Sequence, residues 1–318
     1  MTETLQAYRC ERCGAPLEVT PESIVVICEY CGNPNWMTDI REEIYVVPSL
    51  SKGDIERSFK QRVAEDFDLR RIKNKISIVE VNGVYVPFYF ATVKVEARYE
   101  GYKKRIERVG TGKRARIVTK REKVSGTLRS TLKIPILARR SAEDFSIFEL
   151  AEHFRHSKPE LIKIQEVDWK KIRLPVLNTE ISSEEARDMA RDEAGDRIRE
   201  KAESKVDELI EFQCRTKIVN VSPLTLVPYW YLVYNYGMAQ YKAAYAGWSS
   251  HLLAIQEPVM AYHRALYFIG VLASCAIAAL GFAFLRDLRV ALGALIFASG
   301  LSYALGRKTV SDVRIERG

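Results

Sequence analysis

Two similar stretches, Val84-Tyr-Val-Pro-Phe-Tyr-Phe90 and Leu226-Val-Pro-Tyr-Trp-Tyr231, decide the fold. A strand-like apolar run and then an amphipathic helical pattern precede each stretch, and alternating strand patterns follow it. The apolar runs are residues 44–47 and 172–177, and the helical patterns are residues 51–67 and 182–211. The sequence therefore predicts an α+β fold in which one unit occurs twice, a helix packed on antiparallel strands.

The proline and the aromatic residues of these stretches restrict their place in the sheet. Pro87 and Pro228 have no N–H to donate to a ladder, so we expect them to open their strands or to lie on an edge. The neighbouring Tyr, Phe and Trp side chains have two interpretations, a base-stacking platform for nucleic acid or the buried side of a sheet. Burial is the commoner case, and we expect it here.

Basic residues are concentrated inside the first unit. The chain has 318 residues and a net charge of +8. Its length, with 28% charged and 47% hydrophobic residues, excludes a disordered chain and a small disulfide-stapled scaffold. Residues 98–140 contain fifteen Lys or Arg and three Glu, a net charge of +12 that leaves −4 for the remainder. Strand patterns on both sides of Gly110-Thr-Gly-Lys113 predict a long basic β-hairpin.

This basic hairpin is the candidate binding surface. Anionic lipid, the phosphates of RNA or DNA, and an acidic protein are its three candidate partners, and a plain solvated hairpin is the fourth interpretation. The turn is too short for a phosphate-binding P-loop and has neither its strand nor its helix. The residues that we expect to bind an anionic surface are Lys103, Lys104, Arg105, Arg108, Lys113, Arg114, Arg116, Lys120, Arg121 and Lys123.

Four of the six cysteines form two pairs, Cys10-Glu-Arg-Cys13-Gly and Cys28-Glu-Tyr-Cys31-Gly. The two-residue spacer lets both sulfurs of a pair reach one tetrahedral ion, and the glycine permits the left-handed turn that follows. With a strand–turn–strand pattern over residues 17–27, this spacing predicts a zinc ribbon with one structural Zn²⁺. Two disulfides would need an oxidising compartment, and a redox pair would need a thioredoxin-like setting. Four thiolates leave the metal no open position for catalysis.

Two apolar segments lie near the C-terminus. Residues 265–285 contain no charged residue and match the roughly 20 residues that cross a bilayer as a helix. Residues 290–305 form a shorter run. The small residues expected to permit close helix contact are Gly293, Ala294, Ala298 and Gly300 on this run and Gly270 and Gly281 on the first. A transmembrane helical hairpin is favoured over a buried soluble one, because both segments are apolar all round. With no signal-peptide pattern at the N-terminus, we expect a cell-membrane protein whose bulk and both termini are cytoplasmic.

No group of residues predicts catalysis. The sequence lacks nucleophile-elbow, zinc-protease, Walker and dinucleotide motifs. His153 and His156 lie three residues apart among acidic residues, so a second metal site is conceivable, but a charged solvent-facing helix accounts for them better. We therefore expect no enzymatic activity and no small-molecule substrate.

The order of these features resembles a group of prokaryotic, notably archaeal, zinc-ribbon membrane proteins. The resemblance is carried by Cys10, Cys13, Cys28 and Cys31 and by the Val-Pro-aromatic strands at 86–89 and 227–230. It implies a ribbon, modules of this type and C-terminal transmembrane helices, and it supplies no catalytic residues. The expected divisions are 1–40 (zinc ribbon), 41–140 (first module with the basic hairpin), 141–260 (second module), 261–308 (transmembrane hairpin) and 309–318 (cytoplasmic tail).

These features together predict a non-enzymatic, membrane-anchored adaptor or assembly subunit. It would present the basic surface to a protein partner or to the membrane lipid, and would bind a partner protein or form a homo-oligomer. The alternative is a membrane-tethered protein that binds nucleic acid or the ribosome, because zinc ribbons and basic hairpins are both common in such proteins.

Overall fold

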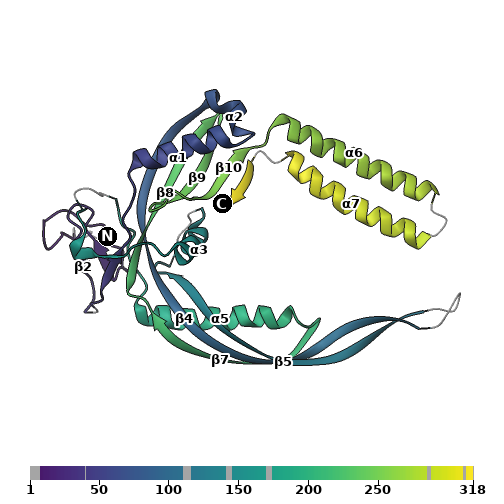
Figure 1. Cartoon of the computed structure of the whole chain (residues 1–318), viewed down its shortest axis with the longest axis horizontal. Helices are drawn as coiled ribbons and strands as arrows, with labels where there is room; N and C mark the ends of the chain where they lie inside the picture. Colours follow the sequence, from purple (N-terminus) through teal and green to yellow (C-terminus); the bar gives the residue numbers. More distant parts are fainter. Residues whose placement is uncertain are drawn as a thin grey trace, which may run out of the picture. The chain divides into compact units, whose positions relative to one another are not determined.

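The structure is a computed structural model that describes residues 8–39, 41–109, 116–140, 145–169, 174–284, 288–310 and 313–317. It is a mixed α+β fold with a large, mainly antiparallel sheet, as the sequence predicts (Figure 1). The chain forms two compact units, the first from residues 1–49 and 83–229 and the second from residues 50–82 and 230–318. The internal repeat and the expected domain boundaries stay predictions. A division into compact units shows neither which segments arose by duplication nor which segments fold independently.

Three strands form the main part of the first unit, β4 (Ile76–Val109), β5 (Arg116–Leu137) and β7 (Glu208–Val221). β4 pairs antiparallel with both other strands. Its ladder with β5 begins at Phe88↔Leu137 and runs along the hairpin, and its ladder with β7 begins at Ala91↔Val221. The predicted basic hairpin is therefore confirmed as β4 and β5. The helix α5 (Ser183–Glu203) packs on one face of these strands (Figure 1). Its buried side chains are Ala186, Ala190, Ala194, Ile198 and Ala202.

The end of α5 corrects the predicted helix over residues 182–211. The Ser182 side chain accepts from the Glu185 N–H and caps the start as expected, but the helix ends at Glu203 and residues 208–221 form β7. In β7 the half-buried Phe212 and Cys214 alternate with exposed polar residues, which is a strand period. Pairing with β4 decides the structure of this segment, and that partner lies about a hundred residues away in sequence.

The remaining elements of the first unit are short. The N-terminal cysteine segment contains β1 (Val25–Ile27) and β2 (Pro34–Trp36), which pair antiparallel. The strand expected at residues 17–20 is absent, because the partner of β1 lies after the second cysteine pair instead of before it. β3 (Ile44–Val46) pairs parallel with β8 (Leu224–Tyr236) and antiparallel with β6 (Ile162–Lys163). The helices here are α3 (Ile147–Ser157) and the 3₁₀ turn η3 (Ile164–Glu166).

The Val-Pro-aromatic stretches lie in the core. Tyr85, Tyr89 and Tyr229 are fully buried, which confirms the core interpretation and excludes a base-stacking platform of these three. Of the two alternatives expected for the prolines, the first is wrong: Pro87 and Pro228 lie inside β4 and β8 and do not open these strands. The hydrogen bond at Pro87 requires only an acceptor from the proline. The Pro87 carbonyl accepts from the Ala138 N–H at 2.9 Å.

The second unit packs the helix α1 (Lys52–Glu65) beside the strands β8, β9 (Ala239–Ala246) and β10 (Leu252–Pro258) (Figure 1). Ser51 and Asp54 form a reciprocal capping box that fixes the predicted start of α1. Phe59 of α1 packs on Tyr234 of β8 with ring centroids 5.0 Å apart. α2 (Leu69–Ile72) and the 3₁₀ turn η1 (Lys73–Lys75) lead into β4.

The two apolar segments form the paired helices α6 (Ala261–Phe284) and α7 (Leu288–Val310). Within the described residues, one helix is long and apolar enough to cross a membrane, with its span at Tyr262–Ala279, whereas the apolar part of α7 is the shorter Leu295–Gly306. Gly293 and Gly300 face open space, so the expected close contact there is wrong. The close contact expected at Gly270 is confirmed, because a Cβ there would lie 3.0 Å from Leu305, and nearby Ser274 hydrogen-bonds Ser302 at 2.6 Å.

The segment expected as a tail contains β11 (Val313–Arg317), which returns to the sheet. It pairs antiparallel with β10 from Ala254↔Arg317 to Pro258↔Val313. The chain therefore leaves the sheet through β10, passes along α6 and α7, and rejoins the same edge.

Candidate metal centre

The two cysteine pairs lie on matching turns. The Gly14 N–H donates to the Cys10 carbonyl at 2.9 Å, and the Gly32 N–H donates to the Cys28 carbonyl at 2.8 Å. Both glycines have a positive φ, +72° and +70°, which other residues adopt only with strain. The predicted role of the glycine after each pair is therefore confirmed.

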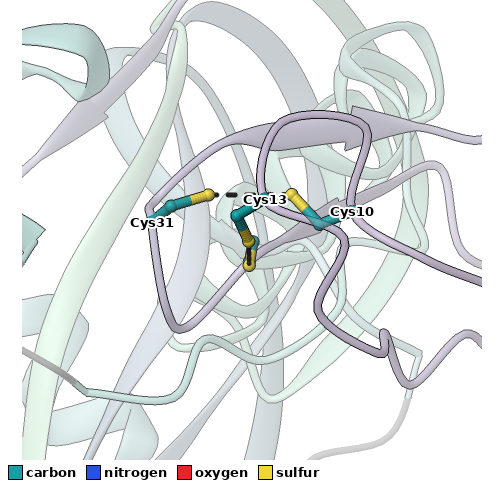
Figure 2. Close-up of side chains that lie close together, drawn as sticks. Cys10, Cys13 and Cys31 are labelled. Carbon is teal, nitrogen blue, oxygen red and sulfur yellow. Dashed lines mark hydrogen bonds between the residues drawn. The ribbon is translucent and has the colours of Figure 1, made fainter.

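The turns bring all four sulfurs together. Cys10 Sγ lies 3.6 Å from Cys31 Sγ, and Cys13 Sγ lies 3.6 Å from Cys28 Sγ, so each contact joins one pair to the other (Figure 2). The four Sγ atoms lie within 4.8 Å of one another, and all four thiols are free. Four cysteine sulfurs at this spacing are suited to one tetrahedral ion such as Zn²⁺.

Asn35 joins the first cysteine turn to the β1–β2 strand pair. Its side chain is 1% exposed, accepts from the Glu11 N–H at 2.9 Å and donates to the carbonyl of Val26 at 3.2 Å. The same amide lies 3.8 Å from Cys10 Sγ. A donor at this distance stabilises a thiolate and orients it, which is the usual role of residues that surround a metal ligand.

The four thiols differ in acidity. Burial alone would raise the pKa of Cys10, but the backbone N–H groups of Cys13 and Arg12 lower it to about 6. Burial raises the pKa of Cys28, and it raises that of Cys31 to about 12. Thiols in contact cannot all ionise without a cation, so a bound dication would be needed to hold four thiolates.

The second turn packs against Trp169 within the first unit. A Cβ at Gly32 would lie 1.8 Å from the indole ring, and Trp169 is 4% exposed and packs edge-on against Tyr85. The cysteine segment is therefore in contact with the core that the Val84–Phe90 stretch builds. Sequence reasoning missed Asn35 and Trp169, because neither carries a local motif.

The predicted anion-binding residues extend along both strands of the hairpin. Lys103, Lys104 and Arg105 lie on β4 opposite residues 120–122 of β5. Lys123 pairs with Glu100, and Arg121 lies 3.4 Å from Glu208, so part of their charge is neutralised. The side chains of Arg108 and Arg116, and the residues Lys113 and Arg114, lie outside the described part.

Among the described residues, His153 and His156 do not belong to any group of ligand side chains close enough together to hold a metal ion. Both lie on α3, where His156 Nδ1 contacts the Glu152 carbonyl at 2.7 Å. A groove of about 600 Å³ between α1, η1 and the first residues of β4 is lined by lysines, glutamates, Asn74 and apolar residues, with no cysteine, histidine or serine.

Two groups of charged residues were missed by the sequence analysis. One surrounds Glu257 near the base of α6, and Arg62, Asp66, Arg314 and Glu316 complete it. The other lies on the exposed face of β4, β5 and β7. Except for Lys94, the cations of this face on β4 and β5 belong to the basic segment 98–140, whereas Arg215 and Lys217 of β7 lie beyond it and were not predicted to join it.

No family model, no curated protein and no solved structure matches the chain. The resemblance to zinc-ribbon membrane proteins therefore stays an expectation that the cysteine spacing carries.

Proposed function

We propose that the chain is a non-enzymatic, membrane-anchored adaptor or assembly subunit. The observation that carries this proposal is the path of the C-terminal helices, which leave the sheet at β10 and rejoin it at β11. An apolar helical pair inserted in one sheet edge holds the sheet next to a membrane and contributes no catalytic group.

The surface of the helical pair supports this role. Apolar side chains that are more than half exposed include Leu266, Phe268, Ile269, Leu272 and Ile277 on α6 and Ile296 and Phe297 on α7. A soluble chain covers a contiguous apolar surface of this kind, whereas a lipid environment accepts it. In this proposal the pair inserts with the bulk of the chain and both termini on the cytoplasmic side.

A structural Zn²⁺ completes the proposed adaptor. Cys10, Cys13, Cys28 and Cys31 would hold it, and a zinc ribbon of the kind found in the resembling membrane proteins would result. The ion would cross-link two turns that the three-residue strands β1 and β2 stabilise only weakly. With four thiolates as ligands the ion has no position for water, which fits a binding protein.

Membrane retention of charge-bearing variants tests the anchor. We expect the full chain to stay in the membrane fraction after an alkaline carbonate wash, and Ile269→Arg combined with Phe297→Arg to release most of it, because a charge in hydrocarbon costs about 3 kcal/mol per residue. Val219→Arg is the matched control, since Val219 is 51% exposed on β7. Equal retention of both variants would overturn the anchor.

The adaptor role is tested by cross-linking in native membranes. We expect a discrete partner band or homo-oligomer that is lost when Lys104→Glu and Lys120→Glu are combined, because both side chains are exposed on the hairpin. The control is Arg187→Glu with Arg191→Glu on α5, which makes the same change of charge. A chain that always stays monomeric, or equal loss in both variants, would contradict the adaptor role.

A membrane-tethered nucleic-acid binder is the second candidate. The arrangement of cations on the exposed side of β4, β5 and β7 favours it.

A further inference from the structure

The side of β4 that faces away from α5 is open and basic. Residues 91, 93, 95 and 97 are buried, so the residues between them point to the opposite side, where Lys94, Glu96 and Arg98 are exposed. In the register of the sheet, Lys94 is opposite Lys217, and Glu96 lies between Arg129 and Arg215. We call this surface the basic sheet face; its cations are Lys94, Arg98, Arg129, Lys133, Arg215 and Lys217.

A single acidic side chain lies among these six cations. Arg129 donates to Glu96 Oε1 from Nε at 3.1 Å and from Nη2 at 2.8 Å, and these bonds, with Arg98 and Arg215 nearby, lower the pKa of Glu96. In the part of the chain that the structure describes, no carboxylate pairs with Lys94 or Lys217.

The pairing of Lys94 with Lys217 is unfavourable in the free protein. Like charges directly opposite each other on neighbouring strands destabilise a sheet. Along one strand the outward residues repeat at about 7 Å, so three successive rows of this face carry unneutralised positive charge. A bound polyanion would remove this repulsion.

The other side chains of this face show which polyanion fits. Between the cations lie the exposed Thr127, Thr131 and Gln213, which are residue types that hydrogen-bond phosphate oxygens. These rows contain no aromatic side chain, which argues against base stacking on a single strand and against a protein interface anchored by aromatic residues. The apolar side chain next to Lys217, Val219 of β7, is 51% exposed but small and isolated, unlike the large apolar groups that insert into lipid.

We propose that the basic sheet face binds the sugar–phosphate backbone of a double-stranded nucleic acid, independently of base sequence. The inference goes beyond the proposed adaptor, because it names a ligand class for a surface that includes β7. It depends on neither the zinc centre nor the membrane anchor.

The test uses the full chain in nanodiscs of neutral lipid and labelled random duplexes of DNA and RNA of about 25 base pairs, over a salt series. We expect the affinity to fall linearly with salt on a logarithmic scale. The variant Lys94→Gln/Arg215→Gln/Lys217→Gln should bind at least about tenfold more weakly at about 100 mM salt, with a salt slope shallower by about two to three.

The matched control removes three positive charges from the other side of the same sheet. Arg187→Gln/Arg191→Gln/Arg199→Gln changes exposed residues of α5, and we expect its affinity and salt slope to stay close to those of the wild type. Thermal unfolding of both variants checks that the fold is intact.

Three results would overturn the proposal. They are no duplex binding by the wild type, equal loss in the sheet and helix variants, and a sheet variant that loses binding only to vesicles containing an anionic phospholipid. The last result would assign the face to lipid. Membrane retention is measured separately, so failure of this inference leaves the proposed anchor unaffected.

Discussion

The cysteine residues carry the most direct chemical expectation in the molecule. Four sulfurs within 4.8 Å of one another, on two turns with glycines at positive φ, form a site that side chains more than ten residues apart build together. Cys214 is half-buried on β7 and outside this cluster.

Substitution of one cluster cysteine should remove the metal. We expect about one zinc per chain in the wild type purified under reducing conditions, and a large loss in Cys28→Ser, because three ligands and a hydroxyl bind zinc much more weakly. Cys214→Ser should keep its zinc. Metal analysis by mass spectrometry measures both, and a wild type without zinc would rule out the ribbon.

Glu257 is a buried acidic residue that lies beside other carboxylates. It is 2% exposed on β10, and burial, with the neighbouring carboxylates of Asp66 and Glu316, raises its pKa to about 7, although Arg314 and Arg62 oppose the shift. Since the folded pKa lies above the unfolded one, the folded state binds the proton more tightly. The contribution of this group to stability is present at pH values below about 4.5 and is lost as the pH rises to about 7.

The unfolding midpoint should record this titration. We expect the wild type to lose stability relative to Glu257→Gln between pH 5 and 7.5, by about 2 kcal/mol, because a neutral amide does not ionise. Glu65→Gln, an exposed residue of α1, is the control and should give a curve parallel to that of the wild type. Thermal unfolding in detergent measures all three, and parallel curves for the wild type and Glu257→Gln would contradict the assignment.

At the scale of elements, α5 depends on small side chains. Its alanines at 186, 190, 194 and 202 are all fully buried, so the helix backbone lies close to the sheet beneath. This spacing of four residues is a weak apolar signal in the sequence, because charged residues occupy most other positions.

A larger side chain in this stripe should separate the helix from the sheet. We expect Ala194→Leu to lower the free energy of unfolding by about 1–3 kcal/mol, since the packed interior leaves no space for three added carbons. Met189→Ala, on the exposed side of α5, should change it by less than about 0.5 kcal/mol. Denaturant unfolding compares them, and equal effects would show that α5 is loosely packed.

At the scale of the whole molecule, strands of the sheet join segments that are far apart in the sequence. β4 takes part in both compact units, and β10 and β11 frame the apolar helices. The ion pairs around Glu257 join α1 to β10 and β11, so the ends of the helical pair are held by charge as well as by the ladder.

The amino-acid sequence by itself determined the features that depend on neighbouring residues. The cysteine turns, the capped starts of α1 and α5, the hairpin of β4 and β5 and the apolar character of α6 follow from spacings of a few residues, because turns, caps and helical faces form locally. Only the tertiary structure decided where α5 ends, which strand pairs with β1, that β11 rejoins β10, and that β7 places Arg215 and Lys217 beside Lys94. Each of these depends on a partner outside its own segment, and sheet pairing with such a partner overrides local propensity.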